Sequence, residues 1–233
     1  GFDFSRVSIA SNNLGNRSRK VAIFFLEQRF TFWDKKFDLT PGVAINIYSD
    51  FGNFAYPGLD VGFQFDRQWR LYGNVGYTYR IPTYTDLYYS DRTTLGNKNL
   101  KPENATAVEI GFRYDRKKLF FSAAYFNRNA KNLIDYVKNN EIDLWQANNI
   151  QKVLTNGFEI DIRFSGRLNK QDQSLRLGYT YLNDKVDGAQ KFNFSRYSIN
   201  SLKHHFTLQS FNKWSDKISS SISIHTRGLI SLF

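Results

Sequence analysis

The sequence has neither cysteine nor methionine, and only four prolines in 233 residues. Without cysteine, no disulfide can hold the fold in any compartment. The missing methionine and the glycine at position 1 indicate a mature fragment, or a sequence from which some residues are absent. No apolar run reaches the roughly 18 residues that a helix needs to span a bilayer, which excludes insertion through transmembrane helices.

Catalytic signatures are also missing. The sequence contains no G-x-S-x-G, no G-x-x-x-x-G-K-[ST] and no H-E-x-x-H. His204 and His205 are adjacent, so on a strand they point to opposite faces, which is poor geometry for one metal ion. The serines of 219–223 with His225 fit an alternating strand better than a hydrolase site. We therefore predict a protein that is not an enzyme, with no catalytic residue, no metal site and no cofactor.

The charge is strongly positive, with a net +11. Such a value raises the question of a nucleic-acid partner, but the Lys and Arg residues are dispersed along the chain and near turns instead of forming a basic block. We therefore expect no nucleic acid among the partners. A soluble, basic, all-β domain that binds carbohydrate or nucleic acid remains the alternative from a different class.

Apolar and polar side chains alternate along most of the chain, which predicts an all-β fold. Clear examples are residues 108–115, 158–164, 175–181 and 61–66. The pattern predicts about eleven strands, several of ten residues or longer, and no convincing helix. At about 3.3 Å per residue, a tilted strand of about ten residues crosses the apolar band of a bilayer, which soluble sandwiches rarely need to do.

The connections between these strands alternate in length, as expected of an up-and-down barrel with two different rims. Short turns are predicted near 34–36, 66–68, 116–117, 166–172 and 213–216. Long connections are predicted at 49–55, 82–105, 129–152 and 183–200, with another at 11–18. Trp33, Trp69 and Trp214 stand beside short turns, whereas Trp145 lies in a long connection. Because indole prefers the membrane interface, three tryptophans at one rim predict an aromatic girdle.

In a barrel, the charged residues that alternate with apolar ones face a hydrated interior. We expect Glu109, Arg113, Asp161 and Arg163 to lie there and to pair across neighbouring strands. In a soluble sandwich the same residues would face bulk water, so alternation by itself does not separate the two folds.

One polar excursion carries a recognisable series of motifs. The run Arg80-Ile81-Pro82-Thr83-Tyr84-Thr85-Asp86-Leu87-Tyr88 is followed by Gly96-Asn97, by Leu100-Lys101-Pro102-Glu103, and then by Glu109 and Gly111. This series resembles the TonB-dependent outer-membrane receptor family, which shows R-x-P-T-x-x-(D/E)-L-(Y/F), then G-N-x-x-L-(K/R)-P-E, then E-x-G. Asn132-Leu133-Ile134 and Asn156-Gly157-Phe158-Glu159 are similar to the hairpin and strand that follow in that family. Three linked elements in order make the match specific, and it covers essentially all of the chain.

The resemblance implies a transmembrane, antiparallel, up-and-down β-barrel in the bacterial outer membrane, crossed many times by one chain. Members have a barrel of about 22 strands closed by an N-terminal plug. About eleven strands make half of such a barrel, so we expect residues 1–233 to be a single domain, a barrel fragment without the plug. The implied partners are the TonB complex through the missing plug, outer-membrane lipid, a small-molecule ligand and, as a further candidate, a surface lipoprotein.

Structural roles are predicted for the motif residues. Pro82 and Pro102 mark where strands stop and resume, and Gly96-Asn97 is expected to adopt the positive φ of a tight turn. Arg80 and Glu103 flank the excursion and are expected to pair across its base. The full set of motif residues is Arg80, Pro82, Thr83, Asp86, Leu87, Tyr88, Gly96, Asn97, Leu100, Lys101, Pro102 and Glu103.

The resemblance also suggests a ligand. Tyr56-Pro57-Gly58-Leu59-Asp60 and the "PTYTDLYY" loop are similar to cobalamin receptors of the Bacteroidetes kind, so a corrinoid is the predicted cargo. A ferric siderophore or haem is the alternative. Tyr84, Tyr88, Tyr89, Arg92 and Trp145 offer flat rings and hydrogen-bond donors on the long loops, and we predict that they bind the ligand.

Overall fold

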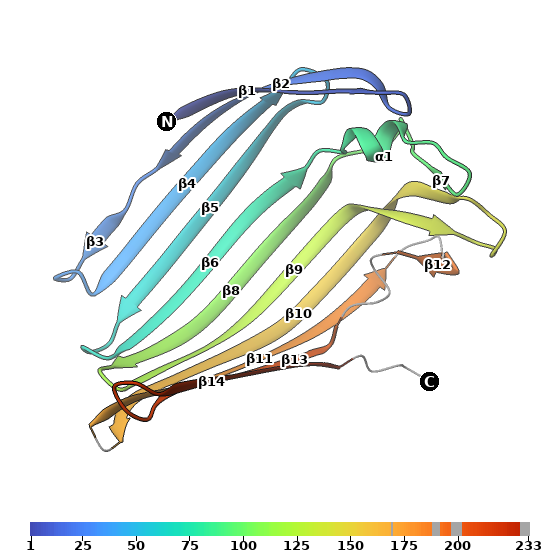
Figure 1. Cartoon of the computed structure of the whole chain (residues 1–233). Coiled ribbons are helices and arrows are strands. Elements are labelled where there is room, and N and C mark those ends of the chain that lie inside the picture. The colour runs from blue at the N-terminus through green and yellow to red at the C-terminus, as the bar shows by residue number, and fades with distance from the viewer. Residues whose placement is uncertain (169, 188–191, 197–201, 229–233) are drawn as a thin grey trace.

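The computed structural model describes residues 1–168, 170–187, 192–196 and 202–228. Within them, eleven strands lie side by side in one strongly curved sheet, each antiparallel to the next (Figure 1). Their order is β1-β2-β4-β5-β6-β8-β9-β10-β11-β13-β14. Strands that follow one another in the chain are neighbours in the sheet, so the predicted all-β, up-and-down arrangement is confirmed.

The strands are long, as the alternation predicted. They are β1 (Phe2–Ser11), β2 (Gly15–Glu27), β4 (Phe37–Tyr48), β5 (Gly52–Gln64), β6 (Trp69–Arg80), β8 (Glu103–Arg116), β9 (Leu119–Lys138), β10 (Trp145–Leu168), β11 (Gln171–Asp187), β13 (His204–Lys213) and β14 (Ser219–Gly228). Three short strands pair at the margins, β3 (Phe30–Phe32) with β4, β7 (Thr94–Leu95) with β10, and β12 (Phe194–Ser195) with β9.

One helix, α1 (Tyr84–Tyr88), lies in the described part of the chain, and it corrects the expectation that there is none. Among the residues that the structure describes, no helix has the length and hydropathy to cross a membrane.

One face of the sheet is apolar because the register aligns the apolar residues of neighbouring strands. Leu71 lies opposite Phe112, and Val75 lies opposite Val108. These side chains and others on the same face, such as Ile110, remain exposed in the sheet. An exposed apolar surface of this extent requires an apolar environment.

The opposite face carries long polar side chains that lie over glycines. A Cβ on Gly62 would stand 1.8 Å from Arg70 Nη2, and one on Gly111 would stand 2.5 Å from Tyr72 Oη. Because Gly62 leaves this space, Arg70 Nη2 reaches Asp38 Oδ2 at 2.6 Å. Because glycine has no side chain at these positions, the large polar groups of neighbouring strands can lie flat along the sheet.

The predicted charge pairing on this face is only partly right. Asp161 accepts Arg163 Nε at 2.8 Å and, across the strand pair, Arg176 Nη2 at 2.6 Å. Glu109 and Arg113 form no ion pair among the described residues. The register gives the reason, because Glu109 faces an asparagine and a phenylalanine across the strands, and Arg113 faces an arginine and a serine.

The two rims of the sheet differ, as the connection lengths predicted. One rim holds tight turns at 33–36, 65–68, 117–118 and 214–218. Trp33, Trp69 and Trp214 are all at this rim and all exposed. At the predicted 166–172 turn the strands instead extend to Leu168 and resume at Gln171, so the connection is shorter than expected.

At the other rim, two predicted long connections are tight turns. β1 ends at Ser11 and β2 begins at Gly15, while β4 ends at Tyr48 and β5 begins at Gly52. Gly15 has φ +71° and Gly52 has φ +84°. Glycine adopts this left-handed region without strain, so each turn closes within a few residues.

The predicted long connection at 129–152 is also shorter than expected, and the one predicted at 183–200 begins later than expected. β9 runs to Lys138 and β10 begins at Trp145, so only 139–144 connect them, and β11 runs to Asp187. Residues 188–191 and 197–200 of the second prediction lie outside the described residues. The backbone ladder of β9 and β10 continues where the side chains become polar, which alternation does not reveal. β9 pairs with β8 as far as Lys131, and the next residue, Asn132, has φ 55°. Figure 1 shows that β9 changes direction along its length.

Candidate functional site

The candidate site lies at the rim with the long connections, around the segment 81–102 between β6 and β8. α1 begins there because Thr83 and Asp86 form a reciprocal cap. Thr83 Oγ1 accepts the N–H of Asp86 at 3.1 Å, and Asp86 Oδ2 accepts the N–H of Thr83 at 2.9 Å. Such a box satisfies backbone donors that a helix start leaves free, which explains a helix of only five residues.

The predicted pair of Arg80 and Glu103 is confirmed. Arg80 Nη2 lies 2.6 Å from Glu103 Oε1, and Arg80 Nη1 lies 3.2 Å from Asp86 Oδ2. Glu103 is buried, and its Oε1 also accepts the N–H of Ile134 at 2.6 Å. This one carboxylate therefore joins the end of β6 to β9, just beyond Lys131, where β9 stops pairing with β8.

Gly96 and Asn97 do not have the predicted positive φ. Glycine is needed at position 96 for another reason, since its Cβ would stand 2.9 Å from backbone atoms of Asp86, Leu87 and Tyr88. The N–H of Gly96 bonds Tyr89 O at 2.6 Å, and the N–H of Asn97 bonds Asp86 O at 2.8 Å. The chain after the helix thus returns to contact the helix backbone directly.

The remaining motif residues anchor the two ends of the segment. Pro82 is buried, and its carbonyl accepts Arg19 Nη2 at 3.1 Å. The backbone N–H and C=O of Lys101, just before Pro102, both bond the amide side chain of Asn149 at 2.9 Å. The segment therefore enters and leaves through fixed contacts with β2 and β10.

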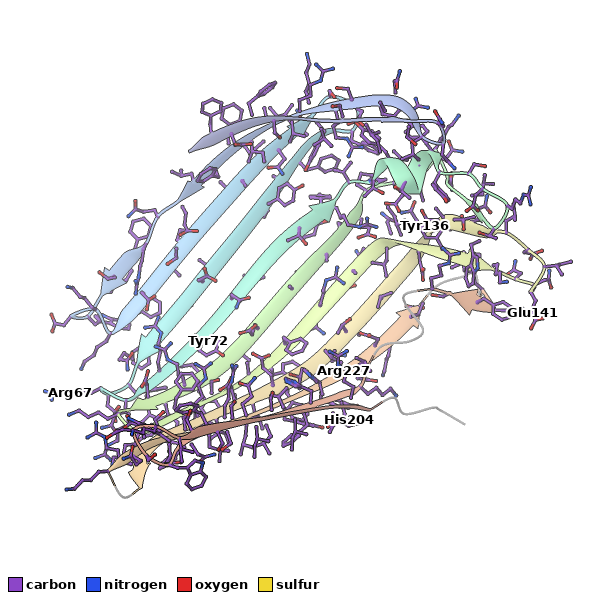
Figure 2. The ribbon with its side chains drawn as sticks, in the orientation of Figure 1. Arg67, Tyr72, Tyr136, Glu141, His204 and Arg227 are labelled. Carbon is purple, nitrogen blue, oxygen red and sulfur yellow. The ribbon has the colours of Figure 1, made fainter. Side chains whose placement is uncertain are left out.

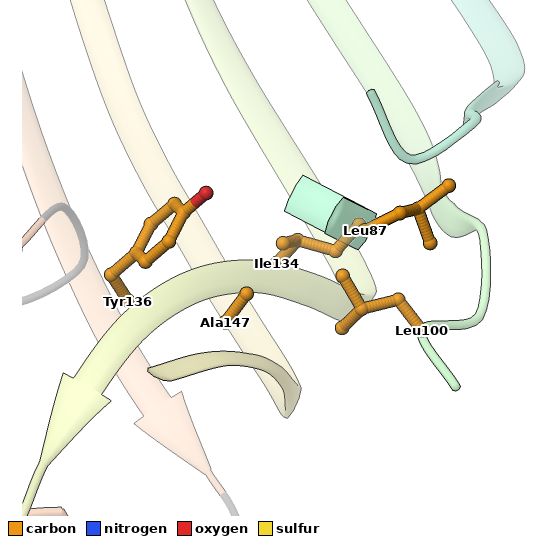
Figure 3. Packing of buried hydrophobic residues seen from close by; sticks show 5 residues of the cluster. All are labelled: Leu87, Leu100, Ile134, Tyr136 and Ala147. Carbon is orange, nitrogen blue, oxygen red and sulfur yellow. The ribbon is translucent and has the colours of Figure 1, made fainter. Parts of the chain in front are cut away.

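A small apolar cluster joins these parts. It consists of Leu87, Leu100, Ile134, Tyr136 and Ala147 (Figure 3). Phe51, Tyr88 and Trp145 pack against it. The cluster draws residues from α1, from the return segment, and from β9 and β10, and it makes the rim a packed layer. Figure 2 shows Tyr136 at this rim and Glu141 at the projecting tip of the β9–β10 hairpin.

Two of the five predicted ligand-binding residues lie next to each other, and each ring contacts the guanidinium group of an arginine on β2. Tyr84 and Tyr88 have ring centroids 6.5 Å apart. The Arg17 guanidinium lies 3.9 Å from the centre of the Tyr88 ring, and Arg19 lies 5.3 Å from that of Tyr84. Arg17 Nε also donates to Leu14 O at 3.0 Å, and Arg19 Nε lies 2.9 Å from Asp50 Oδ1, so hydrogen bonds hold both guanidinium groups over the negative ring faces.

Trp145 lies in a second arrangement of the same kind. Lys138 Nζ stands 5.0 Å from its ring centre and the Arg196 guanidinium 4.7 Å. Arg196 Nη2 also donates to Thr94 Oγ1 at 3.2 Å. Trp145 is thus contacted by Lys138 at the end of β9 and by Arg196, the residue after β12.

The other two predicted ligand-binding residues, Tyr89 and Arg92, lie in the turn that follows α1 in the 81–102 segment. Tyr89 Oη donates to Asp91 Oδ2 at 3.0 Å, and Arg92 is exposed. Asp91 Oδ1 accepts the N–H groups of Thr93 and Thr94, each at 2.7 Å. The bond from the Thr93 N–H is the main cause that lowers the pKa of Asp91 below its usual range.

Several rim residues were missed by sequence reasoning. Arg17 and Arg19 alternate along β2, and this alternation could have placed both on one face. Arg196 and the fully buried Asp135, whose Oδ2 is bonded by Ser195 Oγ, gave no signal, because their partners come from distant parts of the chain. The rim combines rings with cationic donors, a chemistry suited to a ligand with planar, polar or anionic groups.

The sequence matches the family described as "TonB dependent receptor-like, beta-barrel" over residues 2–225. Two curated proteins are similar over shorter stretches, both named vitamin B12 transporter BtuB. The one from Vibrio vulnificus is 28% identical over 91 residues, which is 39% of this chain and 14% of that protein. The one from Photobacterium profundum is 28% identical over 125 residues, 52% of this chain and 20% of that protein.

The siderophore receptor PirA from Pseudomonas aeruginosa has a similar structure, with a TM-score of 0.76 at 17% identity. The match covers 97% of this chain and 41% of the receptor chain, so the chain spans less than half the length of that receptor. At this identity the likeness shows the fold. The curved sheet corresponds to part of an antiparallel, up-and-down receptor barrel.

Proposed function

Because the chain belongs to the TonB-dependent receptor β-barrel family, we propose that it supplies part of the wall and the outer rim of a receptor that imports a scarce small molecule across the bacterial outer membrane. The family is one of transport receptors, and receptors of this kind have no chemical step on the cargo. Uptake is driven by the TonB complex, which acts through a plug.

The observation that carries this proposal is the two-sided sheet with unequal rims. The apolar face, with Val108 and Ile110 exposed, suits lipid, and the opposite face carries ionic groups such as Asp161 with Arg176. A barrel wall in a membrane requires this division, because one face meets acyl chains and the other meets water. The packed rim with Tyr88 and Trp145 supplies a recognition surface at one end.

We propose a corrinoid as the cargo. Both curated relatives are named vitamin B12 transporters. A corrinoid presents a broad conjugated ring edged with amides, which suits flat aromatic groups and amide or guanidinium donors at the rim. Ferric siderophores and haem are the competing cargoes, since PirA is named as a siderophore receptor.

Binding to the full-length receptor in detergent micelles tests the cargo. Isothermal titration with cyanocobalamin, haem and a ferric catecholate siderophore is expected to give saturable binding for cyanocobalamin only. Binding of haem or the siderophore in its place would overturn the corrinoid proposal and leave the receptor proposal standing. A full-length protein that is monodisperse without detergent would overturn the receptor proposal as well.

Variants at the rim test where the cargo binds. Tyr88→Ala and Trp145→Ala are expected to weaken cargo binding by about 30-fold or more, since truncating an aromatic anchor at a recognition surface costs at least about 2 kcal/mol. Arg67→Ala, in a turn at the opposite rim (Figure 2), is the matched control and should bind as the wild type does. Equal affinity in all three variants would place the cargo elsewhere.

A further inference from the structure

The apolar face of β9, β10 and β11 changes character in regular steps toward the rim with the long connections. The register aligns Tyr125, Phe158 and Tyr181 in one row across the three strands. The next row on the same face is Asn127, Asn156 and Asn183, and the one after it is Asn129, Leu154 and Lys185. The fourth row is Lys131, Lys152 and Asp187.

Side-chain contacts confirm that the first two rows share one face. Tyr125 Oη donates to Asn156 Oδ1 at 3.2 Å, and Asn127 Nδ2 donates to the same oxygen. The rings of Phe158 and Tyr181 are 5.6 Å apart. From the apolar band toward the rim, the face thus carries first an aromatic row, then an amide row, and finally the lysines.

The lysines are placed against each other. Lys131 lies directly opposite Lys152, and Lys185 is the diagonal neighbour of Lys152 on the other side. Like charges in opposed positions destabilise a strand pair. Asp187 is the one acid in these four rows, and none of the three lysines forms an ion pair among the described residues. The group carries excess positive charge, and a bound anion would relieve the repulsion.

The distance of the lysines from the aromatic row, measured along the strands, indicates which kind of anion they meet. Lys185 is four residues beyond Tyr181 and Lys131 six beyond Tyr125, which is about 13 and 20 Å along strands that rise about 3.3 Å per residue. The tilt of barrel strands reduces these values to about 10 and 15 Å of height above the aromatic row. Flexible lysine stems bring the ammonium groups back toward the membrane, at the level of lipid headgroups.

We propose that Lys131, Lys152 and Lys185 bind the phosphate-bearing headgroup of a lipid in the outer leaflet, with its acyl chains on the apolar face below. The proposal rests on the proposed function, because that places this face against lipid. A lipid fits better than free phosphate, since the cationic group is continuous with the apolar band through the amide row. Asn127 and Asn156 lie between the two and suit the polar linkage region of a lipid.

Binding of lipid A to the full-length receptor in detergent micelles tests the proposal. The probes are fluorescent lipid A with both phosphates, the same lipid with both phosphates removed, and inorganic phosphate as a competitor. The wild type is expected to bind the phosphorylated lipid tightly and the dephosphorylated lipid much more weakly. Inorganic phosphate at the same concentration should displace neither.

The double variant Lys131→Gln/Lys152→Gln should bind the phosphorylated lipid about 30-fold more weakly, since each lysine near an anionic surface contributes about 1 kcal/mol. Lys131→Arg/Lys152→Arg keeps the charge and should bind as the wild type does. Lys117→Gln/Lys118→Gln, in an exposed turn at the opposite rim, is the control for net charge. Resistance of the folded barrel to heat in detergent checks that each variant folds.

Equal affinity of the wild type for both lipids, or equal losses in the two glutamine variants, would overturn the proposal. Displacement by inorganic phosphate would show a free-anion site instead of a lipid site, which also overturns it. Cargo binding is measured on the same samples. A receptor that binds cargo without preferring the phosphorylated lipid refutes only the lipid site, whereas one that does not require detergent refutes the proposed function itself.

Discussion

Arg80 Nη2 lies 2.6 Å from Glu103 Oε1, and the same carboxylate oxygen accepts the N–H of Ile134 at 2.6 Å. The pair therefore does more than close the base of the 81–102 segment. It also fixes β9 where that strand stops pairing with β8, so the cation is not the only partner of this carboxylate.

Glu103→Ala should open this contact. The change removes the partner of Arg80 and leaves the buried N–H of Ile134 without an acceptor, at a cost of about 2–3 kcal/mol. Hydrogen exchange on the full-length receptor should show loss of protection at Ile134. The reversed pair, Arg80→Glu with Glu103→Arg, should not restore protection, because arginine cannot accept the Ile134 N–H. Restoration by the reversed pair would refute this role.

Gly96→Ala should loosen the return of the chain onto α1. The added Cβ would stand 2.9 Å from backbone atoms of the helix, and overpacking of this kind costs about 1–3 kcal/mol. Limited proteolysis of the full-length receptor should show faster cleavage between Ser90 and Lys98. Gly76→Ala is the matched control, because nothing lies within 4 Å of its Cβ position, and its cleavage should not change. Equal cleavage of both variants would contradict the prediction.

Asn149→Ala should free the end of the segment from β10. The Asn149 amide bonds both backbone groups of Lys101 and donates to Asn132 O at 2.7 Å, so its loss should cost about 1–3 kcal/mol locally. Exchange at the Lys101 amide reports the change. Asn148→Ala removes only a weak bond of 3.4 Å to Gln146 O on the same strand and should leave Lys101 protected.

The turn held by Asp91 should loosen in acid. Hydrogen bonds, mainly the one from the Thr93 N–H, lower the pKa of Asp91 in the folded state. The ionised carboxylate therefore stabilises the turn at pH values above the unfolded pKa of about 3.9. This stabilisation is lost as the pH falls through the lower folded pKa. A spin label at Arg92→Cys should become more mobile over that range, and the chain has no other cysteine to label. Asp91→Asn should abolish the step, and a step of equal size in that variant would contradict the assignment.

The strands and their order were predictable because a sheet with one apolar and one polar face has a period of two, which residues 108–115 show clearly. The helix was not predicted, since α1 is shorter than the span over which helical periodicity is visible. Its signal is local, a threonine at position 83 followed three residues later by Asp86, and both residues also belong to the family motif.

The rim was predictable only in part. The pairing of Arg80 with Glu103 follows from their positions on either side of one excursion. The contacts of Trp145 with Arg196 and of Asn149 with Lys101 join residues about 50 apart in the chain. Sequence spacing does not encode such contacts, because they arise where β9 and β10 continue past the end of β8 and β10 pairs with β7 of the segment.

Glycines under long polar side chains have a consequence for the width of any passage along the polar face. Arg70 lies over Gly62 and Tyr72 over Gly111, so each side chain occupies a layer about one ring or one guanidinium thick instead of projecting by its full length. The polar face therefore carries charged and phenolic groups that project only a short distance from the sheet. A side chain at Gly62 or Gly111, even an uncharged one, would push Arg70 or Tyr72 away from the sheet and narrow such a passage.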